Sequence, residues 1–215
     1  MGRWEPDARS RLERAALELF LAHGFDDVTV PQITARAGLT TRTFHRHFID
    51  KREVLFSDAD QMPALAARLV LDAPPELAPL DVVAQGLSTL ASAAFEGRLQ
   101  QLKQRTTVID GHDGLREREL RKMERLTRAI ADAFEQRGVD DLTAAVMAET
   151  TVGVVKVALR RWLRSDGEQP LQTIMTDSLT RVRDAFSGTG SPSTSARQPA
   201  GQTVDKRPAP RVDRS

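Results

Sequence analysis

The chain has 215 residues, a formal net charge of +1 at pH 7, and neither cysteine nor tyrosine. This length allows one sizeable domain or two small ones, and without cysteine neither disulfides nor thiolate metal sites can form. Alanine, leucine, arginine and glutamate dominate the composition, so we expect an all-α fold. The start is charged rather than apolar, and no run of about 18 apolar residues follows. We therefore expect a cytoplasmic protein that does not enter membranes.

The first expected helix spans about residues 7–23. Its apolar residues have the i, i+3, i+4, i+7, i+8 spacing of a single buried face. Gly24 follows the last of them and can adopt the left-handed conformation that closes a helix. The residues of this face are Leu12, Ala15, Ala16, Leu19 and Phe20.

A second helix is expected to begin after Thr29. Thr29 and Gln32 have the spacing of a capping box, and Pro31 falls in the first turn, where backbone amides lack partners anyway. Gly38 supplies a tight turn, and Thr40 caps the third helix. Two short helices joined by such a turn are typical of a helix-turn-helix, which places its second helix in the major groove of DNA.

The third helix is expected to have an apolar and a polar face. Phe44 and Phe48 repeat at i, i+4 on the inner side, so residues rotated away from them face solvent or a ligand. Residues 36–52 carry five basic side chains against Asp50 alone, which makes a basic patch in a neutral chain. The outer residues offer hydroxyl, guanidinium and imidazole groups to DNA. They are Thr41, Arg42, His45 and Arg46.

These polar groups predict specific contacts with double-stranded DNA. Arg42 is best suited to the O6 and N7 atoms of guanine, whereas phosphate contacts position the protein without specifying sequence. We expect base contacts from Thr41, Arg42 and Thr43. Phosphate contacts are expected from Thr29, His45 and Lys51. Thr40 and Arg46 are expected to belong to the same DNA-binding surface. Two alternatives remain open: a solvated helix face in an ordinary helical protein, and a helical adaptor that binds protein.

Several segments occur in one order between about residues 9 and 56: RLERAALELF from Arg11, HGF from His23, VTV from Val28, AGLT from Ala37 and TFHRHFIDKREVL from Thr43. Together they resemble the N-terminal domain of the TetR family. The resemblance implies three DNA-binding helices joined through a fourth to a helical ligand-binding and dimerising domain. The family usually has tyrosine where this chain has His45, and that tyrosine commonly touches phosphate. His45 is expected to do the same, with a pH-dependent strength.

Six further segments with helical punctuation follow, which gives about nine helices in all. They span about residues 51–72, 79–96, 98–109, 113–138, 140–165 and 168–186, and Pro63 should kink or shorten the first. We expect a helix-turn-helix domain over residues 1–50 and a ligand-binding and dimerisation domain over 51–187. Residues 188–215 are rich in Ser, Thr, Pro, Gly and Arg, so we expect a disordered tail.

The stretch from Asp113 to Leu163 resembles the C-terminal domain of mycofactocin-system-type regulators, which implies a small-molecule effector of the acyl-CoA kind. Basic side chains in this stretch could bind the phosphates of such a ligand, and apolar side chains in this part of the chain could line a cavity for its acyl chain. A solvated basic face and an ordinary core explain the same residues, so this alternative remains open. The cations are Arg116, Arg118, Arg121 and Lys122, and the expected cavity residues are Leu99, Leu102, Met123 and Trp162.

A regulator of this family needs two half-sites and hence two-fold symmetry, so we expect a homodimer on a palindromic operator. Gly153 interrupts a valine-rich stretch, at a cost of about 1 kcal/mol unless a neighbour approaches closely there. That neighbour is either a partner chain or another part of the same chain. The expected interface residues are Gly153, Val157, Met175 and Leu179.

The sequence does not favour an enzyme. Three of the four histidines fall in the DNA-binding segment, His45 and His47 point to different sides of a helix, and phosphate-loop and nucleophile motifs are absent. We expect neither a metal nor a cofactor. The expected function is that of a repressor: a ligand bound among helices four to eight moves the fourth helix, with a hinge at Pro63, and operator affinity falls.

Overall fold

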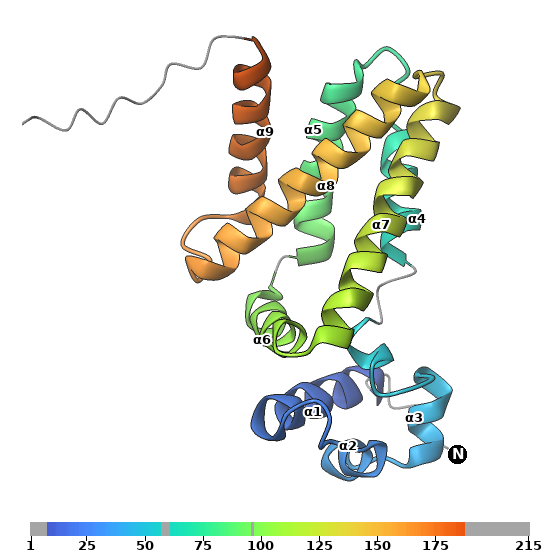
Figure 1. Cartoon of the computed structure of the whole chain (residues 1–215), viewed down its shortest axis with the longest axis vertical. Coiled ribbons are helices and arrows are strands. Elements are labelled where there is room, and N and C mark those ends of the chain that lie inside the picture. Colours follow the sequence, from blue (N-terminus) through green and yellow to red (C-terminus); the bar gives the residue numbers. More distant parts are fainter. Residues whose placement is uncertain (1–7, 57–60, 96, 188–215) are drawn as a thin grey trace, which may run out of the picture.

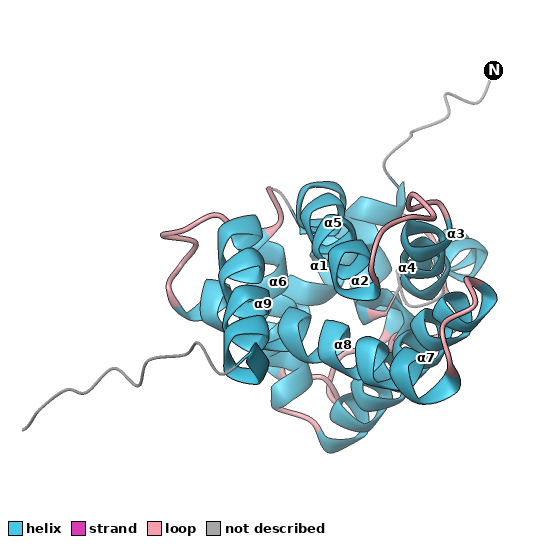
Figure 2. Ribbon diagram, turned by 90° about the horizontal axis from the view of Figure 1, so that it is seen from above, coloured by secondary structure: helices cyan, strands magenta, loops and turns pink. Residues whose placement is uncertain are grey.

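The computed structural model describes residues 8–56, 61–95 and 97–187, and all regular structure in these ranges is helical (Figures 1 and 2). This confirms the predicted all-α fold. The smaller unit contains α1 (Ala8–His23), α2 (Val30–Ala37) and α3 (Thr41–His47), followed by the short 3-10 helix η1 (Glu53–Leu55). The larger unit contains α4 (Gln61–Leu71), α5 (Pro79–Leu90), the π-helical turn η2 (Ala91–Phe95), α6 (Leu99–Asp110), α7 (Asp113–Gln136), α8 (Asp141–Arg164) and α9 (Leu171–Ser187).

The fourth helix differs most from the sequence prediction. Instead of one helix over residues 51–72, the chain forms η1 and then α4 from Gln61. Pro63 lies in the first turn of α4, where its missing N–H has no helical acceptor to lose. It therefore does not kink the helix, whereas the other predicted outcome, a shorter helix, is confirmed. The remaining helices lie within a few residues of their predicted bounds. The predicted tail, 188–215, lies outside the described residues.

The smaller unit has a core of its own, built on the fully buried Leu12, Ile33 and Phe44. This core does not end at residue 50. It continues into the segment around η1, residues 50–56, which we call the linker, and into the corner between α6 and α7. These two segments contribute Val54, Leu55, Phe56, Val108, Ile109 and Leu115. Helices α1 to α3 are therefore packed onto the larger unit, and α6 lies across the boundary in Figure 1.

The larger unit is built around α7 and α8. Helix α7 packs along α4 and α8, and α8 packs against α9. Met175 and Leu179 of α9 are buried inside this core within one chain. The prediction that these two residues form a dimer interface is therefore wrong, because their apolar helical spacing serves the intrachain core.

Helix α8 is also the one described helix that is long and apolar enough to cross a membrane by length and composition. Its apolar residues are partly core residues, among them Ala144, Ala148, Val152 and Trp162, which pack within the larger unit. The core helix of a soluble protein passes the same test. Packing in the core therefore accounts for this part of its apolar composition.

Candidate nucleic-acid interface and ligand cavity

Local backbone contacts fix the turn between α2 and α3. Gly38 adopts φ 65° and ψ 37°, a left-handed conformation that suits glycine. The hydroxyl of Thr40 accepts a hydrogen bond from the Thr43 amide at 3.1 Å and so caps α3. The guanidinium of Arg11 donates to the Ala37 carbonyl at 2.7 Å, which satisfies the end of α2. The predicted capping residues and the glycine turn are confirmed.

The opposite faces of α3 differ as the helical period predicts. Phe44 and Phe48 are buried, whereas Thr41, His45 and the two arginines Arg42 and Arg46 are exposed. Within the part of the chain that the structure describes, Arg42 and Arg46 form neither a hydrogen bond nor an ion pair. Two guanidinium groups are thus presented to solvent on one side of a helix that the core holds from behind.

Thr29 and Thr43 are more constrained than the sequence suggests. The amide and hydroxyl of Thr29 both donate to the side-chain oxygen of Gln32, at 2.7 and 2.8 Å. The hydroxyl of Thr43 lies 3.0 Å from that of Thr40 and its side chain is half-buried. Both hydroxyls are exposed, yet each has a hydrogen-bond partner within the chain.

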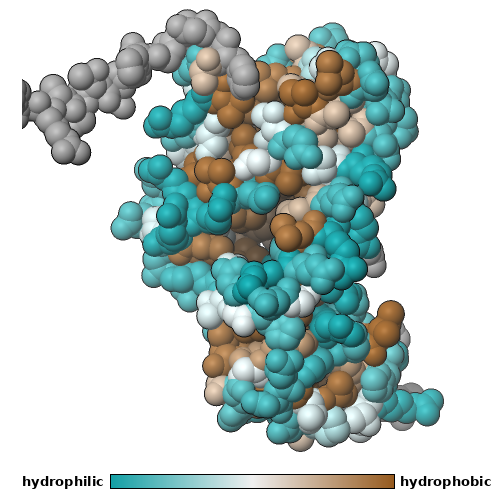
Figure 3. Space-filling model, viewed as in Figure 1, coloured by the Kyte–Doolittle hydropathy of each residue, from teal (hydrophilic) through white to brown (hydrophobic). Residues whose placement is uncertain are grey.

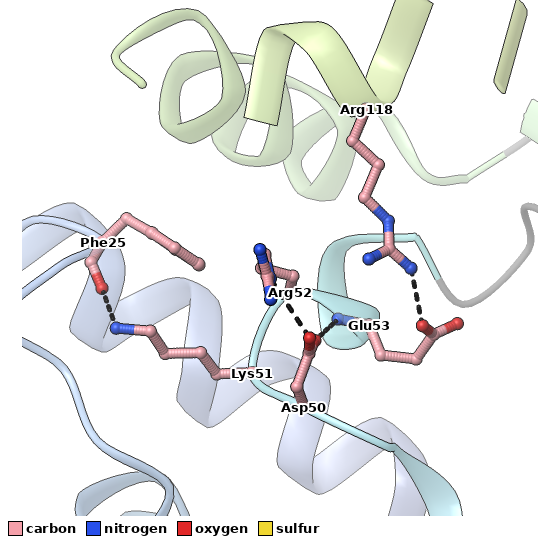
Figure 4. Close-up of polar contacts among 6 residues, drawn as sticks. All are labelled: Phe25, Asp50, Lys51, Arg52, Glu53 and Arg118. Carbon is pink, nitrogen blue, oxygen red and sulfur yellow. Dashed lines mark hydrogen bonds and ion pairs between the residues drawn. The ribbon is translucent and has the colours of Figure 1, made fainter. Parts of the chain in front are cut away.

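Lys51 is not placed as a phosphate contact. Its ammonium donates to the carbonyls of Phe25, Asp26 and Val28 at 2.8, 3.0 and 2.9 Å, and it lies 4.5 Å from the centre of the Phe25 ring. Figure 4 shows the bond to the Phe25 carbonyl. An ammonium has three donors, and all three are used inside the protein. We therefore correct the prediction for Lys51: it fastens the loop after α1.

His47, the last residue of α3, is half-buried. Its Nε2 atom is buried and has no hydrogen-bond partner among the described residues. Burial lowers the pKa of His47, and the positive charges of Arg46 and Arg9 lower it further. These effects favour the neutral imidazole at the C-terminal end of α3. In the sequence, the only indication of this burial is the position of His47 next to Phe48, which is itself buried.

Polar contacts hold the linker η1 in place, as Figure 4 shows. The Asp50 carboxylate accepts from the Glu53 amide at 2.9 Å and from Arg52 Nε at 3.1 Å. Burial acts to raise the pKa of Asp50, but these hydrogen bonds and the charge of Arg52 outweigh it and leave the pKa lowered. The Glu53 carboxylate in turn accepts from Arg118 of α7 at 2.7 Å. The linker is thus tied to the larger unit.

A second arginine reaches the same linker from α6. Arg105 Nε donates to the Leu55 carbonyl at 2.6 Å. The guanidinium groups of Arg105 and Arg118 lie 5.2 and 5.1 Å from the centre of the Phe56 ring. Phe56 is buried, so the ring and two cations form one compact junction between the units. Arg105 carries no local sequence signal for this contact, because Leu55 lies 50 residues away in the chain.

His112 makes another contact between the units. Its Nε2 atom lies 3.2 Å from a carboxylate oxygen of Asp26, and its ring packs edge-on against Phe25 at 5.0 Å. Its Nδ1 atom accepts from the Leu115 amide at 3.2 Å and caps α7. An acceptor Nδ1 places the ring proton on Nε2, where it can donate to Asp26.

A cavity of about 370 Å³ lies between the units and among α4 to α8. Figure 3 shows a hollow with apolar walls in the middle of the molecule, rimmed by hydrophilic residues. Of the predicted cavity residues, Leu102 and Met123 line it. Leu99 and Trp162 do not, because they pack at the turn beside Gly167, where a Cβ atom would lie 2.8 Å from Leu99. The prediction is wrong for those two.

The wall of this cavity includes a half-buried ion cluster. Arg105 Nη2 lies 2.5 Å from Glu119 Oε2, and Lys122 Nζ lies 3.8 Å from the other carboxylate oxygen. The side chains are only 19, 27 and 13% exposed. Burial acts to raise the pKa of Glu119, but the charges and hydrogen bonds of Arg105 and Lys122 outweigh it and hold the pKa below its usual value.

The four cations predicted to meet phosphates are not gathered at the cavity. Lys122 lines it, whereas the other three form ion pairs elsewhere. Their partners are Asp113 for Arg116, Glu53 for Arg118 and Glu117 for Arg121. No group of three or more potential metal-ligating side chains occurs within the described ranges.

Comparison with known proteins now decides the family. The family model described as "Bacterial regulatory proteins, tetR family" matches residues 13–57, and that of the "MftR C-terminal domain" matches residues 77–187. The chain belongs to the TetR family. Members of this family are transcriptional regulators that bind DNA through a helix-turn-helix and act as dimers, and ligand-responsive repression is typical of them.

Individual relatives agree with this membership. The chain is 27% identical over 180 residues to the regulator TcmR of Streptomyces glaucescens, covering 79% of this chain and 80% of that protein. It is 26% identical over 170 residues to the putative mycofactocin biosynthesis regulator MftR of Mycobacterium tuberculosis, covering 77 and 85%. The fold resembles that of Bacillus subtilis FadR in complex with stearoyl-CoA, with a TM-score of 0.52, 18% identity and coverage of 80 and 95%.

Proposed function

We propose that this TetR-family chain represses transcription as a homodimer on a palindromic operator and that a small ligand in the cavity between its units releases it. One observation carries the proposal: the cavity wall includes Leu17 of α1 and residues 54–56 of the linker. A molecule that fills the cavity therefore touches the DNA-binding unit directly. The proposal gives the protein no catalytic role and places it in the cytoplasm with its DNA.

The exposed face of α3 supports the DNA side of this proposal. Arg42 stands at the first turn without an intrachain partner in the described residues, so we assign it to a guanine edge. Its neighbours Thr41 and Thr43 are assigned to bases or adjacent backbone. Thr29, His45 and Arg46 are assigned to phosphates, which position α3 in the groove.

The outer face of α8 supports dimerisation. Leu142, Val146 and Val157 are 71, 50 and 51% exposed, and with Gly153 they repeat at helical spacing. A Cβ atom on Gly153 would meet nothing within 4 Å among the described residues outside its own helix backbone. This open space favours a partner chain over an intrachain crossing at Gly153. We propose that this stripe, with the outer side of α9, packs against its symmetry mate in a four-helix interface.

The cavity supports an amphipathic effector. Its wall is mainly aliphatic and also includes the cations Arg105 and Lys122. A ligand with an apolar chain and an anionic part would match both kinds of residue, and an acyl-CoA is of this kind. The structurally similar FadR of Bacillus subtilis binds stearoyl-CoA in its crystal structure. We propose an acyl-CoA-like effector for this chain on the chemistry of its cavity.

Release requires that ligand binding change the spacing of the two recognition helices. Pro63 does not kink α4, so we no longer place the hinge there. The linker η1 is the better candidate, because it borders the cavity and is fastened by Arg105 and Arg118. A ligand that disturbs these contacts would let the DNA-binding helices move.

Selection of bound duplexes from a random-sequence DNA library tests this function. We expect enrichment of a palindromic sequence whose half-sites are about 10 base pairs apart, or a multiple of that spacing. Long-chain acyl-CoA added to the purified complex should weaken binding at constant salt concentration. Failure to enrich any sequence would contradict the proposal, and so would undiminished operator affinity with ligand bound.

A further inference from the structure

We propose that Arg105 is the ligand sensor: the anionic head of a bound amphiphile replaces Glu119 on its guanidinium, and Arg105 then releases the Leu55 carbonyl of the linker. This inference rests on the proposed function, since it concerns how ligand binding in the same cavity is transmitted to the DNA-binding unit. It assigns the ligand class, an anionic amphiphile, and the residue that couples the ligand to the DNA-binding unit.

The position of Arg105 carries the inference. Its side chain lines the cavity and is 19% exposed. One nitrogen lies 2.5 Å from the Glu119 carboxylate, and another donates to the Leu55 carbonyl at 2.6 Å. A single rigid guanidinium therefore joins Glu119 of the cavity wall to the backbone of the linker. Arg118 holds the same linker through Glu53 but does not line the cavity.

The charges around the cavity favour an anion. Glu119 lies between two cations, Arg105 and Lys122, so one carboxylate faces two positive charges. Among the described wall residues five are cationic and three are acidic, and such an excess attracts anions into a cleft. The remaining wall is largely aliphatic, which suits the chain of an amphiphile rather than a small inorganic anion.

The geometry of guanidinium recognition explains why binding would loosen the linker. A carboxylate or phosphate binds arginine most strongly through two parallel N–H groups. In the structure, Nε of Arg105 donates to the Leu55 carbonyl and Nη2 to the Glu119 carboxylate. An anion that takes both groups displaces the carboxylate and the carbonyl together. Leu55 then loses its bond to α6, while Glu53 keeps its bond to Arg118.

Full-length protein and three probes test the inference: dodecanoate, dodecanoyl-CoA and the uncharged dodecanol. Binding is measured by calorimetry without DNA, and amide hydrogen exchange is followed over residues 52–56. We expect the anionic probes to bind about tenfold more tightly than the alcohol and to accelerate exchange in the linker, which the alcohol leaves unchanged. A preference for dodecanoyl-CoA over dodecanoate would identify phosphate, rather than carboxylate, as the preferred head group.

Variants separate this role from general packing. Glu119→Gln removes the competing carboxylate and should strengthen binding of the anionic probes about tenfold without affecting dodecanol. Arg105→Met should abolish the preference for anions. Lys103→Met is the matched control, because Lys103 lies on the same helix but pairs with Asp166 at 2.9 Å and does not line the cavity. It should behave as wild type.

Three results would overturn the inference: no binding of any probe, equal binding of charged and uncharged probes, or an unchanged preference in Glu119→Gln. Linker exchange that does not respond to dodecanoate would also overturn it. Failure of the proposed function has a different signature. In that case no operator is selected from random DNA, whereas the anion preference, which is measured without DNA, still holds.

Discussion

Replacement of Lys51 by methionine tests whether this residue fastens the loop after α1 or binds DNA. Methionine keeps an unbranched apolar stem but removes the three donors that contact Phe25, Asp26 and Val28. The bond to Asp26 is exposed, so that carbonyl regains water. A hydrogen bond to a charged group contributes about 1.5–3 kcal/mol. The two part-buried bonds, at the lower end of that range, give a loss of about 3 kcal/mol.

Two assays separate the roles. Urea unfolding of the full-length protein measures the loss of stability, and the salt dependence of binding to random duplex DNA counts phosphate contacts. Each contact contributes about 0.9 to the slope of log affinity against log salt concentration. Lys51→Met should lower stability by about 3 kcal/mol and leave the slope per subunit unchanged. Arg46→Met, on the exposed face of α3, should lower the slope by about 0.9 and alter stability by less than about 0.5 kcal/mol.

The opposite pattern would refute this reasoning. If Lys51→Met lowered the slope as Arg46→Met is expected to, with stability nearly unchanged, then Lys51 would leave its carbonyl acceptors when DNA binds. The original prediction of a phosphate contact would then hold.

Three further outcomes are expected. Thr40→Ala should lower the free energy of unfolding by about 1 kcal/mol through loss of the α3 cap, measured by urea unfolding, whereas Thr41→Ala, at an exposed position, should change it little. Val157→Glu should convert dimers to monomers in sedimentation experiments, while Leu71→Glu, at an exposed position on α4, leaves the dimer intact; a dimeric Val157→Glu would contradict the α8 interface. The lowered pKa of His47 means that the unfolded chain binds more protons. Stability should therefore fall as pH drops below the ordinary histidine pKa of 6.5, and less steeply in His47→Gln; identical pH profiles would exclude this role.

Local signals allowed much of the DNA-binding unit to be predicted. The caps at Thr29 and Thr40 and the turn at Gly38 depend on residues three or four positions apart, so sequence spacing specifies them. Lys51 illustrates the limit. Its type suggested a phosphate contact, but its acceptors lie 23 to 26 residues earlier in the chain, and only the folded core brings them together.

The larger unit was harder to predict for a related reason. Helical spacing identifies an apolar face but not what covers it, so the buried Met175 and the exposed Val157 looked equivalent in the sequence. In the same way Leu99 and Leu102 lie on one helix, three residues apart, yet only Leu102 faces the cavity. The coupling residue Arg105 carried no local signal, because its role depends on the distant Leu55 and Phe56.

The most direct test of DNA recognition by α3 compares binding of wild type and Arg42→Ala to a selected operator and to random duplex DNA at one salt concentration. The wild type should prefer the operator by at least about a thousandfold. Arg42→Ala should lose about 1–3 kcal/mol of that preference and keep most of its affinity for random DNA. Equal losses on both duplexes would reduce Arg42 to a phosphate contact, and a wild type without preference would contradict sequence-specific recognition altogether.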